Sequence, residues 1–404
     1  MTRPATDWMA VAYGVSLGCL AAYQQFKLPP ALPVLLGLYD YDRRVAGGFM
    51  SVYAVAGLLL SLPIGRRIQR RGAEPYLYLA FLLMLAGDVA VLAWPASDGL
   101  VLAARGLEGI AFAVCAIAGP ALANLSASNR HLGIVFGLTA LWIPAGQLAA
   151  TLLTPLALAT GGWKTLWMLA VVATAAMALW TRSMARRGSL RPGTAERRSD
   201  HPDAGEGNSR RRRNLLLATV IFMLWSGQYF GYMTWLPQYL VETYQLSIGA
   251  AAAGYALPVA TLLAFNLLTG MALRGGWSLG WLLAAALVSQ AAVWWLIPST
   301  TGAVLGPLSL VAYGIGAGIT PTCLFALPSA ILGAGRAAAG FGVMMTGRNL
   351  GVLLGPVVLA ELSRQYGGWN GAVPTFAAAT TAAAMLAIYL NHRLEAPRRA
   401  GVAG

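Results

Sequence analysis

Charged residues are scarce in this chain of 404 residues. Only 10% of them are Asp, Glu, Lys or Arg, against about 25% in soluble domains. Hydrophobic residues make up 58%, in stretches long enough for helical spans of roughly 20 residues. A β-barrel would instead show short segments of alternating hydrophobicity. The composition predicts an all-α membrane protein that crosses the bilayer several times.

Cysteine and histidine are also scarce, with three of each. Cys19, Cys115 and Cys323 fall inside apolar segments, at spacings that suit neither a disulfide framework nor a metal site. The chain has no GxxxxGK phosphate loop, which argues against ATP as its energy source. No nucleophile and base form a recognisable pair. We therefore predict neither an enzyme nor a bound metal or cofactor.

Acidic residues are fewer than basic ones, which gives a net charge of +14. The arginines gather between apolar stretches, as the positive-inside rule requires of a membrane protein, so we predict no nucleic-acid partner. With both termini in the cytoplasm, only Arg43, Arg44, Lys164 and Arg364 lie outside. The Ala/Gly/Arg-rich composition favours a bacterial source. These features predict a multi-pass protein of the bacterial cytoplasmic membrane.

Proline, glycine and polar clusters divide the chain into twelve predicted spans. They lie near residues 8–37, 45–64, 76–94, 100–123, 132–158, 163–181, 214–240, 247–272, 278–297, 303–327, 338–362 and 371–391. Residues 182–213 are polar and rich in Arg, Gly and Pro, which predicts a cytoplasmic linker. We expect an N-terminal six-helix bundle (1–181) and a C-terminal six-helix bundle with a short cytoplasmic tail (214–404).

The two expected bundles resemble each other in sequence. Three pairs of positions match at separations of 206, 205 and 204 residues. The pairs are Gly161 and Gly367, Gly65 and Gly270, and Pro33 and Pro237. Such parallel repeats are typical of transporters, whose solute site lies near the bilayer midplane.

The segment IGRRIQRRG, between the second and third spans, resembles a signature of the major facilitator superfamily. Gly65, Gln69, Arg70 and Gly72 occupy its positions, with glutamine where the family has an acid. In the family this loop latches the inward face through charge pairing. The resemblance therefore implies a gating role for these four residues, with a weaker latch than usual.

RGLEG in the fourth span is similar to a second pattern of that family, through Arg105 and Gly109. The resemblance covers nearly the whole chain outside the linker and tail. It implies alternating access, with spans 1, 4, 7 and 10 lining the cavity. FKLPPALPVLL and the WLP of the seventh span are loosely similar to cyanate/nitrate-type and other organic-anion permeases.

Lys27 is the residue that most needs an explanation, because a charge inside a span is expensive. In a helix, Tyr23, Gln24 and Lys27 share one face, which could line a cavity for a hydrophilic solute. The ammonium group would attract an anion. The alternative is a lysine that snorkels to the membrane interface.

Arg348 and its neighbour Asn349 lie in the middle of the eleventh span. The planar guanidinium suits two-point binding of a carboxylate, although it could instead bond backbone carbonyls or a buried acid. We expect Lys27, Arg348 and Arg105 to form a basic cavity.

Three acids are candidates for coupling or gating. Glu108 lies three residues after Arg105 and can pair with it; we place both near the cytoplasmic end of the fourth span. Asp88 and Glu361 lie toward the periplasmic ends of the third and eleventh spans, where structural roles are the alternative. Any of the three could carry a proton.

In the seventh span, Gln228, Tyr232 and Trp235 fall at helical spacing on one face. Tyr313 in the tenth span belongs to the same expected cavity. These side chains could define the shape of the solute, although Trp235 could equally pack in the core or anchor the helix at the membrane interface.

Together these features predict secondary active transport of a small anionic solute, by proton symport or anion exchange. The expected partners are that solute, protons or a counter-anion, and membrane lipids, with the protein acting as a monomer. One alternative is an efflux transporter for a drug, siderophore or amphipathic metabolite, in which Lys27 pairs with an acid such as Asp88 or Glu361. A membrane receptor on the same fold is a third reading, for which no signalling domain is visible.

Overall fold

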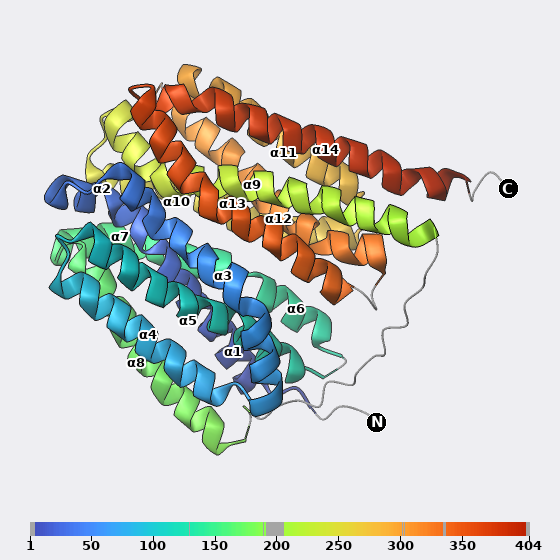
Figure 1. Cartoon of the computed structure of the whole chain (residues 1–404), viewed down its shortest axis with the longest axis horizontal. Helices are drawn as coiled ribbons and strands as arrows, with labels where there is room; N and C mark the ends of the chain where they lie inside the picture. Colours follow the sequence, from blue (N-terminus) through green and yellow to red (C-terminus); the bar gives the residue numbers. More distant parts are fainter. Residues whose placement is uncertain are drawn as a thin grey trace. The chain divides into compact units, whose positions relative to one another are not determined.

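The computed structural model describes residues 5–128, 130–188, 190, 206–300, 302, 304–333 and 337–400. Within these ranges the chain is helical and contains no strand, which confirms the predicted fold class (Figure 1). The helices are α1 (Trp8–Phe26), α2 (Leu28–Tyr39), α3 (Arg43–Arg71), α4 (Glu74–Ala93), α5 (Asp98–Leu125), α6 (Leu132–Ala140), α7 (Trp142–Thr160), α8 (Lys164–Arg186), α9 (Glu206–Tyr244), α10 (Ile248–Arg274), α11 (Leu279–Leu296), α12 (Leu305–Leu332), α13 (Ala337–Gln365) and α14 (Val373–Ala400).

Two expected spans are each broken into a pair of helices. The first breaks at Lys27, because Pro29 and Pro30 have no N–H to continue the hydrogen bonds of α1. The fifth breaks at Leu141, where Pro144 has no N–H for the carbonyl of the residue four positions earlier. The breaks divide these spans into α1 with α2, and α6 with α7.

Other helices extend into segments that were expected to be loops. α3 runs to Arg71, so IGRRIQRR forms its last turns, and the connection to α4 is confined to Gly72 and Ala73. Gly72 has φ +85°, a conformation that glycine adopts without strain. α8 reaches Arg186 and α9 begins at Glu206, both inside the expected linker. Residues 191–205 of that linker lie outside the described residues.

The chain forms two compact units. Unit 1 comprises residues 1–194 and 233–259, and unit 2 comprises residues 195–232 and 260–404, so the chain passes between them within α9 and α10. The expected bundle boundaries stay a prediction. In unit 1, α5 is central, because α1, α3 and α4 all pack against it. The backbones of α1 and α5 touch where Gly14 faces Gly119. In unit 2, α11 packs against α12 and α14.

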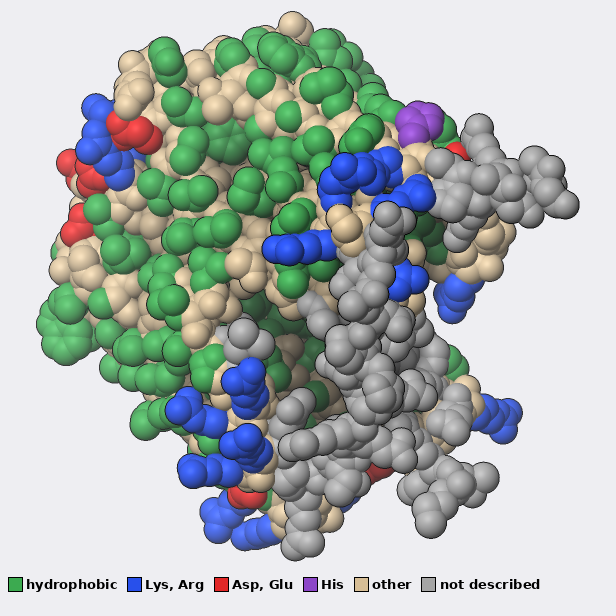
Figure 2. Space-filling model, turned by 45° about the vertical axis from the view of Figure 1, so that its right-hand side comes forward, with side chains coloured by type: hydrophobic (Ala, Val, Ile, Leu, Met, Phe, Trp, Pro, Cys, Tyr) green, Lys and Arg blue, Asp and Glu red, His purple; other side chains and the backbone are tan. Residues whose placement is uncertain are grey.

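Many large apolar side chains are exposed, as expected of helices in a bilayer. Leu59, Leu82 and Leu179 are 69%, 63% and 70% exposed. Figure 2 shows hydrophobic side chains over a broad area, with lysine and arginine gathered in patches beside it. In the part of the chain that the structure describes, 11 helices are long and apolar enough to cross a membrane. The first expected span, broken at Lys27, is not among them.

Candidate functional site

The break at Lys27 creates a polar site inside unit 1. Because Pro29 cannot donate, the carbonyl of Gln25 lacks its usual helical partner. Arg105 on α5 fills that place: its Nη2 donates to the Gln25 carbonyl at 2.8 Å, and its Nη1 donates to the Gln24 carbonyl at 2.8 Å. Its Nε donates to the carbonyl of Phe49 at 3.2 Å. The proline pair therefore explains why an arginine can lie fully buried here.

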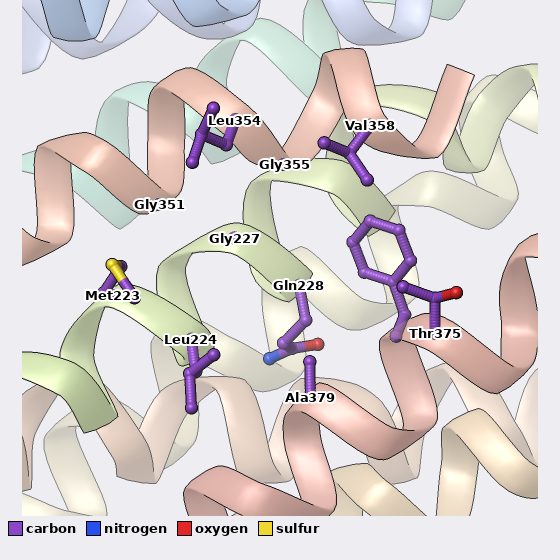
Figure 3. Close-up of a pocket in the computed structure, with 11 residues that line it drawn as sticks. Met223, Leu224, Gly227, Gln228, Gly351, Leu354, Gly355, Val358, Thr375 and Ala379 are labelled. Atoms are coloured by element: carbon purple, nitrogen blue, oxygen red, sulfur yellow. The ribbon is translucent and has the colours of Figure 1, made fainter. Parts of the chain in front are cut away.

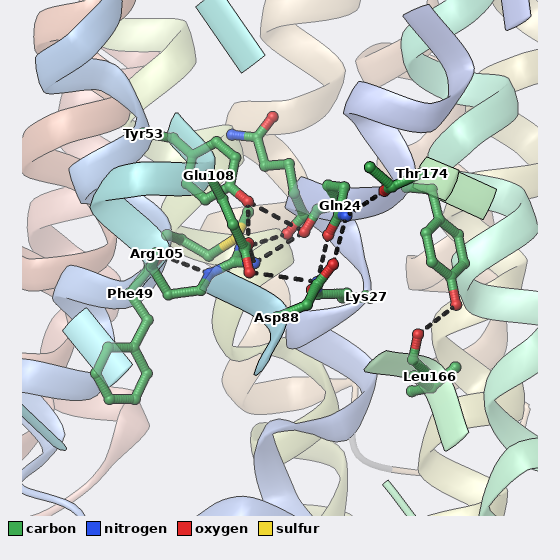
Figure 4. A network of polar contacts seen from close by, with 12 residues as sticks. Gln24, Lys27, Phe49, Tyr53, Asp88, Arg105, Glu108, Leu166 and Thr174 are labelled. Carbon is green, nitrogen blue, oxygen red and sulfur yellow. Dashed lines mark hydrogen bonds and ion pairs between the residues drawn. The ribbon is translucent and has the colours of Figure 1, made fainter. Parts of the chain in front are cut away.

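Lys27 pairs with two carboxylates. Its Nζ donates to Asp88 Oδ1 on α4 and lies 3.4 Å from Glu108 Oε1 on α5 (Figure 4). It also donates to Gln24 Oε1, and Gln24 Nε2 in turn donates to Asp88 Oδ2 at 2.8 Å. The Lys27 and Asp88 side chains are 0% exposed, so the lysine does not snorkel to the interface.

Glu108 is held more tightly than Asp88. Its Oε2 accepts from Arg105 Nη1 at 2.5 Å and from the hydroxyl of Tyr53 at 2.5 Å. The Arg105 guanidinium also lies 4.5 Å from the centre of the Tyr53 ring. Glu108 thus faces two cations and a hydroxyl, whereas the hydrogen bonds of Asp88 come from one lysine and one amide.

Lys27, Asp88, Arg105 and Glu108 form what we call the buried charge cluster. Its two cations and two carboxylates sum to zero formal charge, and all four residues are 0% exposed. A buried pair is strongly destabilised when one member is removed, so each charge depends on the others. Lys27 is therefore neutralised inside the protein, rather than open to a bound anion.

The depth assigned to Arg105 and Glu108 from the sequence is wrong. They were placed near the cytoplasmic end of their span and Asp88 toward the periplasmic end, yet all three lie at one level (Figure 4). α4 ends at Ala93 and α5 begins at Asp98, so the two helices form a tight antiparallel pair. The end of one must therefore face the start of the other. Gly87 permits their close approach, since a Cβ there would lie 2.8 Å from Glu108 Cγ.

Several residues of this network were not predicted from the sequence. Tyr53 on α3 and Thr174 on α8, which accepts from Gln24 Nε2 at 3.2 Å, belong to no motif. Trp167 places its ring 5.0 Å from Lys27 Nζ. Tyr23, which was expected beside Lys27, instead donates to the carbonyl of Leu166 at 2.9 Å and fixes α1 to α8.

Arg348 on α13 is the buried cation of unit 2. It is 8% exposed, and its Nη1 donates to Asn349 Oδ1 at 3.1 Å. Its guanidinium lies 5.3 Å from the ring centre of Phe230. Across the ranges that the structure describes, no carboxylate pairs with it. The side chain of Asn349 thus turns toward that of its neighbour Arg348.

Gln228, Tyr232 and Tyr313 come together in unit 2. The rings of Tyr232 and Tyr313 stack with centroids 3.9 Å apart, and the Tyr313 hydroxyl donates to Gln228 Oε1 at 2.8 Å. Trp294 of α11, which the sequence did not indicate, donates to the same oxygen at 2.8 Å. Trp235 is buried and belongs to unit 1.

The remaining predicted residues lie on or near surfaces. Glu361 pairs with Arg364 at 2.8 Å on the exposed side of α13. Arg70 is exposed on the last turn of α3, and a Cβ on Gly65 would meet nothing within 4 Å. The side chain of Gln69 lies outside what the structure describes.

One further ion pair was not expected. Arg43 Nη2 at the start of α3 pairs with Glu242 Oε1 near the end of α9, within unit 1. Gln238 Nε2 also donates to that oxygen, at 2.6 Å. Among the described residues, no three His, Cys, Asp or Glu side chains form a group that could hold a metal ion.

Comparison with known proteins agrees with the fold. Residues 15–356 match the model of the Major Facilitator Superfamily. Two solved structures show the same fold: the human organic anion transporter MFSD10 (TM-score 0.69, 17% identity, 95% of this chain and 100% of that chain) and the nucleoside transporter NupG (0.70, 14%, 94% and 99%).

A curated relative, the MFS-type transporter ppzB of Metarhizium majus (strain ARSEF 297), is 29% identical over 154 residues. The match covers 38% of this chain and 32% of that protein, so the chain spans about a third of its length. The family match, by contrast, covers most of the chain. The chain therefore belongs to the major facilitator superfamily, as its motifs predicted, and is a multi-pass membrane protein.

Proposed function

We propose that the protein is a secondary active transporter for a small anionic solute, driven by proton symport or by anion exchange. It acts as a monomer in the bacterial cytoplasmic membrane, with both termini in the cytoplasm. The observation that carries the proposal is the state of Arg348. Its buried guanidinium has an amide oxygen and an aromatic ring as partners, and no carboxylate among the described residues.

A buried cation without a counter-charge is unfavourable, and an anionic solute removes that penalty. The fork of the guanidinium has five N–H donors and suits a carboxylate or phosphate group. Lys27 cannot supply this attraction while Asp88 and Glu108 neutralise it. We therefore assign solute attraction to Arg348, with Asn349 orienting it, and assign coupling to the buried charge cluster.

Replacing Arg348 by glutamine is expected to weaken anion binding by about 10- to 100-fold, the range for a hydrogen bond to a charged group. Stability should change little or rise, because the variant removes a buried charge with which no described carboxylate pairs. The measurement is thermal unfolding of the purified protein against a panel of small carboxylates and inorganic anions, since a ligand that binds only the folded state raises its stability.

The matched control is Arg364→Gln on the same helix. Arg364 is 48% exposed and pairs with Glu361, so its loss should leave anion binding unchanged. If the same anion stabilises wild type and Arg348→Gln equally, Arg348 does not bind the solute.

Within the cluster, Asp88 is the best candidate to carry the coupling proton. One cation, Lys27, bonds to it, whereas Glu108 faces both Lys27 and Arg105 and accepts from Tyr53. A proton on Asp88 would weaken its hold on Lys27 and leave that ammonium to Glu108. The cluster then has two arrangements that differ by one proton, which is what coupling requires.

An Asp88→Asn variant is expected to lose proton-driven accumulation of solute and to keep solute exchange. The amide mimics the protonated acid and cannot release a proton. The measurement uses proteoliposomes with an imposed pH gradient, and counterflow of labelled solute in the same vesicles shows that the protein is folded. Gradient-driven accumulation at the wild-type level would exclude Asp88 as the proton carrier.

Efflux of an amphipathic drug, siderophore or metabolite is the second candidate function. The observed pairing of Lys27 with Asp88 favours efflux, because the efflux alternative assumes that Lys27 pairs with an acid inside the protein. It is distinguished by ligand class: cations or neutral amphiphiles would stabilise wild type and Arg348→Gln alike, and small anions would stabilise neither.

A further inference from the structure

The start of α9 and the end of α14 lie together at one end of unit 2 (Figure 1). Arg210 of α9 reaches across to α14, where its Nη2 donates to the backbone carbonyl of Arg393 at 2.6 Å. Arg213 follows Arg210 by three residues and therefore falls on the same face of α9. We call Arg210, Arg213 and Arg393 the arginine group. Two helices that are distant in the sequence thus bring three positive charges to one place.

The arginine group is open to solvent and has no counter-charge from the protein. Arg210 and Arg213 are exposed, and Arg393 is partly exposed. Among the side chains that the structure describes, no carboxylate forms an ion pair with any of the three. Glu395 lies two residues after Arg393, on a different side of α14, and accepts from Asn391 Nδ2 at 3.2 Å. The group can therefore attract an anion from outside the chain.

A stripe of exposed side chains on α14 leads from the apolar surface to the arginine group. Met385 and Tyr389 are 60% and 51% exposed, and with Arg393 they follow at four-residue intervals along one face of a helix that can span the membrane. Trp281 of α11 is 48% exposed and lies beside α14, with its ring centre 5.9 Å from that of His392. Tryptophan and tyrosine collect at the boundary between hydrocarbon and headgroups. Arg393, one turn beyond Tyr389, therefore lies at the level of the lipid phosphates.

Tyr389 also holds the Arg393 side chain in place. Arg393 Nη1 donates to the Tyr389 hydroxyl at 3.2 Å, and the guanidinium lies 5.6 Å from the centre of the Tyr389 ring. A side chain that is ordered before binding loses less entropy when a ligand arrives. The planar guanidinium matches the geometry of a phosphate, with which it forms charge-assisted hydrogen bonds.

We propose that this end of unit 2 binds one anionic phospholipid, whose phosphate lies among Arg210, Arg213 and Arg393 and whose acyl chains lie along Met385 and Tyr389. The occupant is a lipid because the exposed apolar face of α14 lies in the bilayer. Its headgroup is anionic because three arginines without a described counter-charge favour a net negative partner. The site shares no residue with the buried charge cluster or the proposed anion site, so it is independent of the proposed function.

The test compares dioleoylphosphatidylglycerol with dioleoylphosphatidylcholine, which have the same acyl chains and one phosphate each but differ in net charge. The purified full chain is stripped of lipid in detergent and titrated with each lipid, and the first bound lipid is quantified by native mass spectrometry. Wild type should bind phosphatidylglycerol about ten-fold tighter or more. Arg210→Gln and Arg393→Gln should each weaken that binding about five-fold, the effect of one basic residue near an anionic lipid surface. Binding of phosphatidylcholine should stay as in wild type.

Arg212→Gln is the matched control. Arg212 is exposed on the same helix, and α9 turns by about 200° over the two residues from Arg210, so it points away from the arginine group. The variant removes the same charge and should bind phosphatidylglycerol as wild type does. If it loses as much affinity as Arg210→Gln, the lipid responds to the total charge of this helix end, and the proposed site is wrong. Equal binding of the two lipids to wild type would also overturn the proposal.

A final arm separates a lipid from a free phosphate compound. Glycerol 3-phosphate carries the same phosphate without acyl chains, so it should displace phosphatidylglycerol only when present in large excess. Displacement at concentrations equal to that of the lipid would identify a soluble phosphate compound as the occupant, and would overturn the assignment to a lipid.

Discussion

Replacing Lys27 by methionine is expected to lower the free energy of unfolding by about 3–5 kcal/mol and to abolish transport. The methionine fills the same volume but leaves the fully buried Asp88 without its cation and Glu108 with Arg105 alone. The cluster then carries a net negative charge with no water to screen it. The measurement is unfolding of the purified protein in detergent, beside solute uptake in proteoliposomes.

The control is Lys164→Met, because Lys164 is the other lysine of the chain and its side chain is exposed. That variant should differ from wild type by less than about 0.5 kcal/mol. The contrast separates the loss of a buried partner from the loss of a positive charge as such.

The double variant Lys27→Met with Asp88→Asn tests whether the two residues act as a pair. It restores electrical neutrality, so it should recover much of the stability that Lys27→Met loses, as a double-mutant cycle would show. Proton-driven accumulation of solute should stay absent, because Asp88, the proposed proton carrier, has been replaced. A double variant no more stable than Lys27→Met would mean that Lys27 and Asp88 are not energetically coupled.

Much of this site could be predicted from the sequence, but its pairing could not. Lys27 and Arg105 are conspicuous because charges within spans are rare. The partners of Lys27 lie 61 and 81 residues away, and they come together because α1 and α4 both pack against α5. That Asp88 and Glu108 lie at the same level could have been predicted from the sequence. The connection between the third and fourth spans is short, so the end of one span must lie beside the start of the other.

The break at Lys27 also had a sequence signal, the consecutive prolines Pro29 and Pro30. The signal must be interpreted in two steps. Pro29 leaves the carbonyl of Gln25 without its helical partner, and Arg105, which is distant in the sequence, donates a hydrogen bond to that carbonyl. By contrast, the pairing of Arg43 with Glu242 spans 199 residues and follows from tertiary packing alone. The spans themselves were predictable because apolar length sets them, whereas α3, α8 and α9 continue beyond the apolar stretches into polar sequence.

A valine at Gly355 is expected to destabilise unit 2 by about 3 kcal/mol or more, and to reduce the yield of folded protein sharply. Gly355 of α13 lies against the backbone of Gly227 in α9, so closely that even a Cβ would overlap the carbonyl of Gly227. Helices in a bilayer gain little from the hydrophobic effect and depend on such close contact. The two helices cannot shift to make room for the valine, because Gly351 of α13 also lies against Gly227 (Figure 3). A Cβ on Gly351 would be 2.7 Å from the Gly227 nitrogen.

Gly342→Val on the same helix is the matched control. Gly342 is exposed and a Cβ there would meet nothing within 4 Å, so this variant should fold as wild type does. The comparison is made by size-exclusion yield and thermal unfolding in one detergent. Because both variants add the same side chain to the same helix, helix propensity cancels and the difference reports the crossing alone. Wild-type stability for Gly355→Val would mean that α9 and α13 can separate without loss, and that their backbone contact does not hold the unit together.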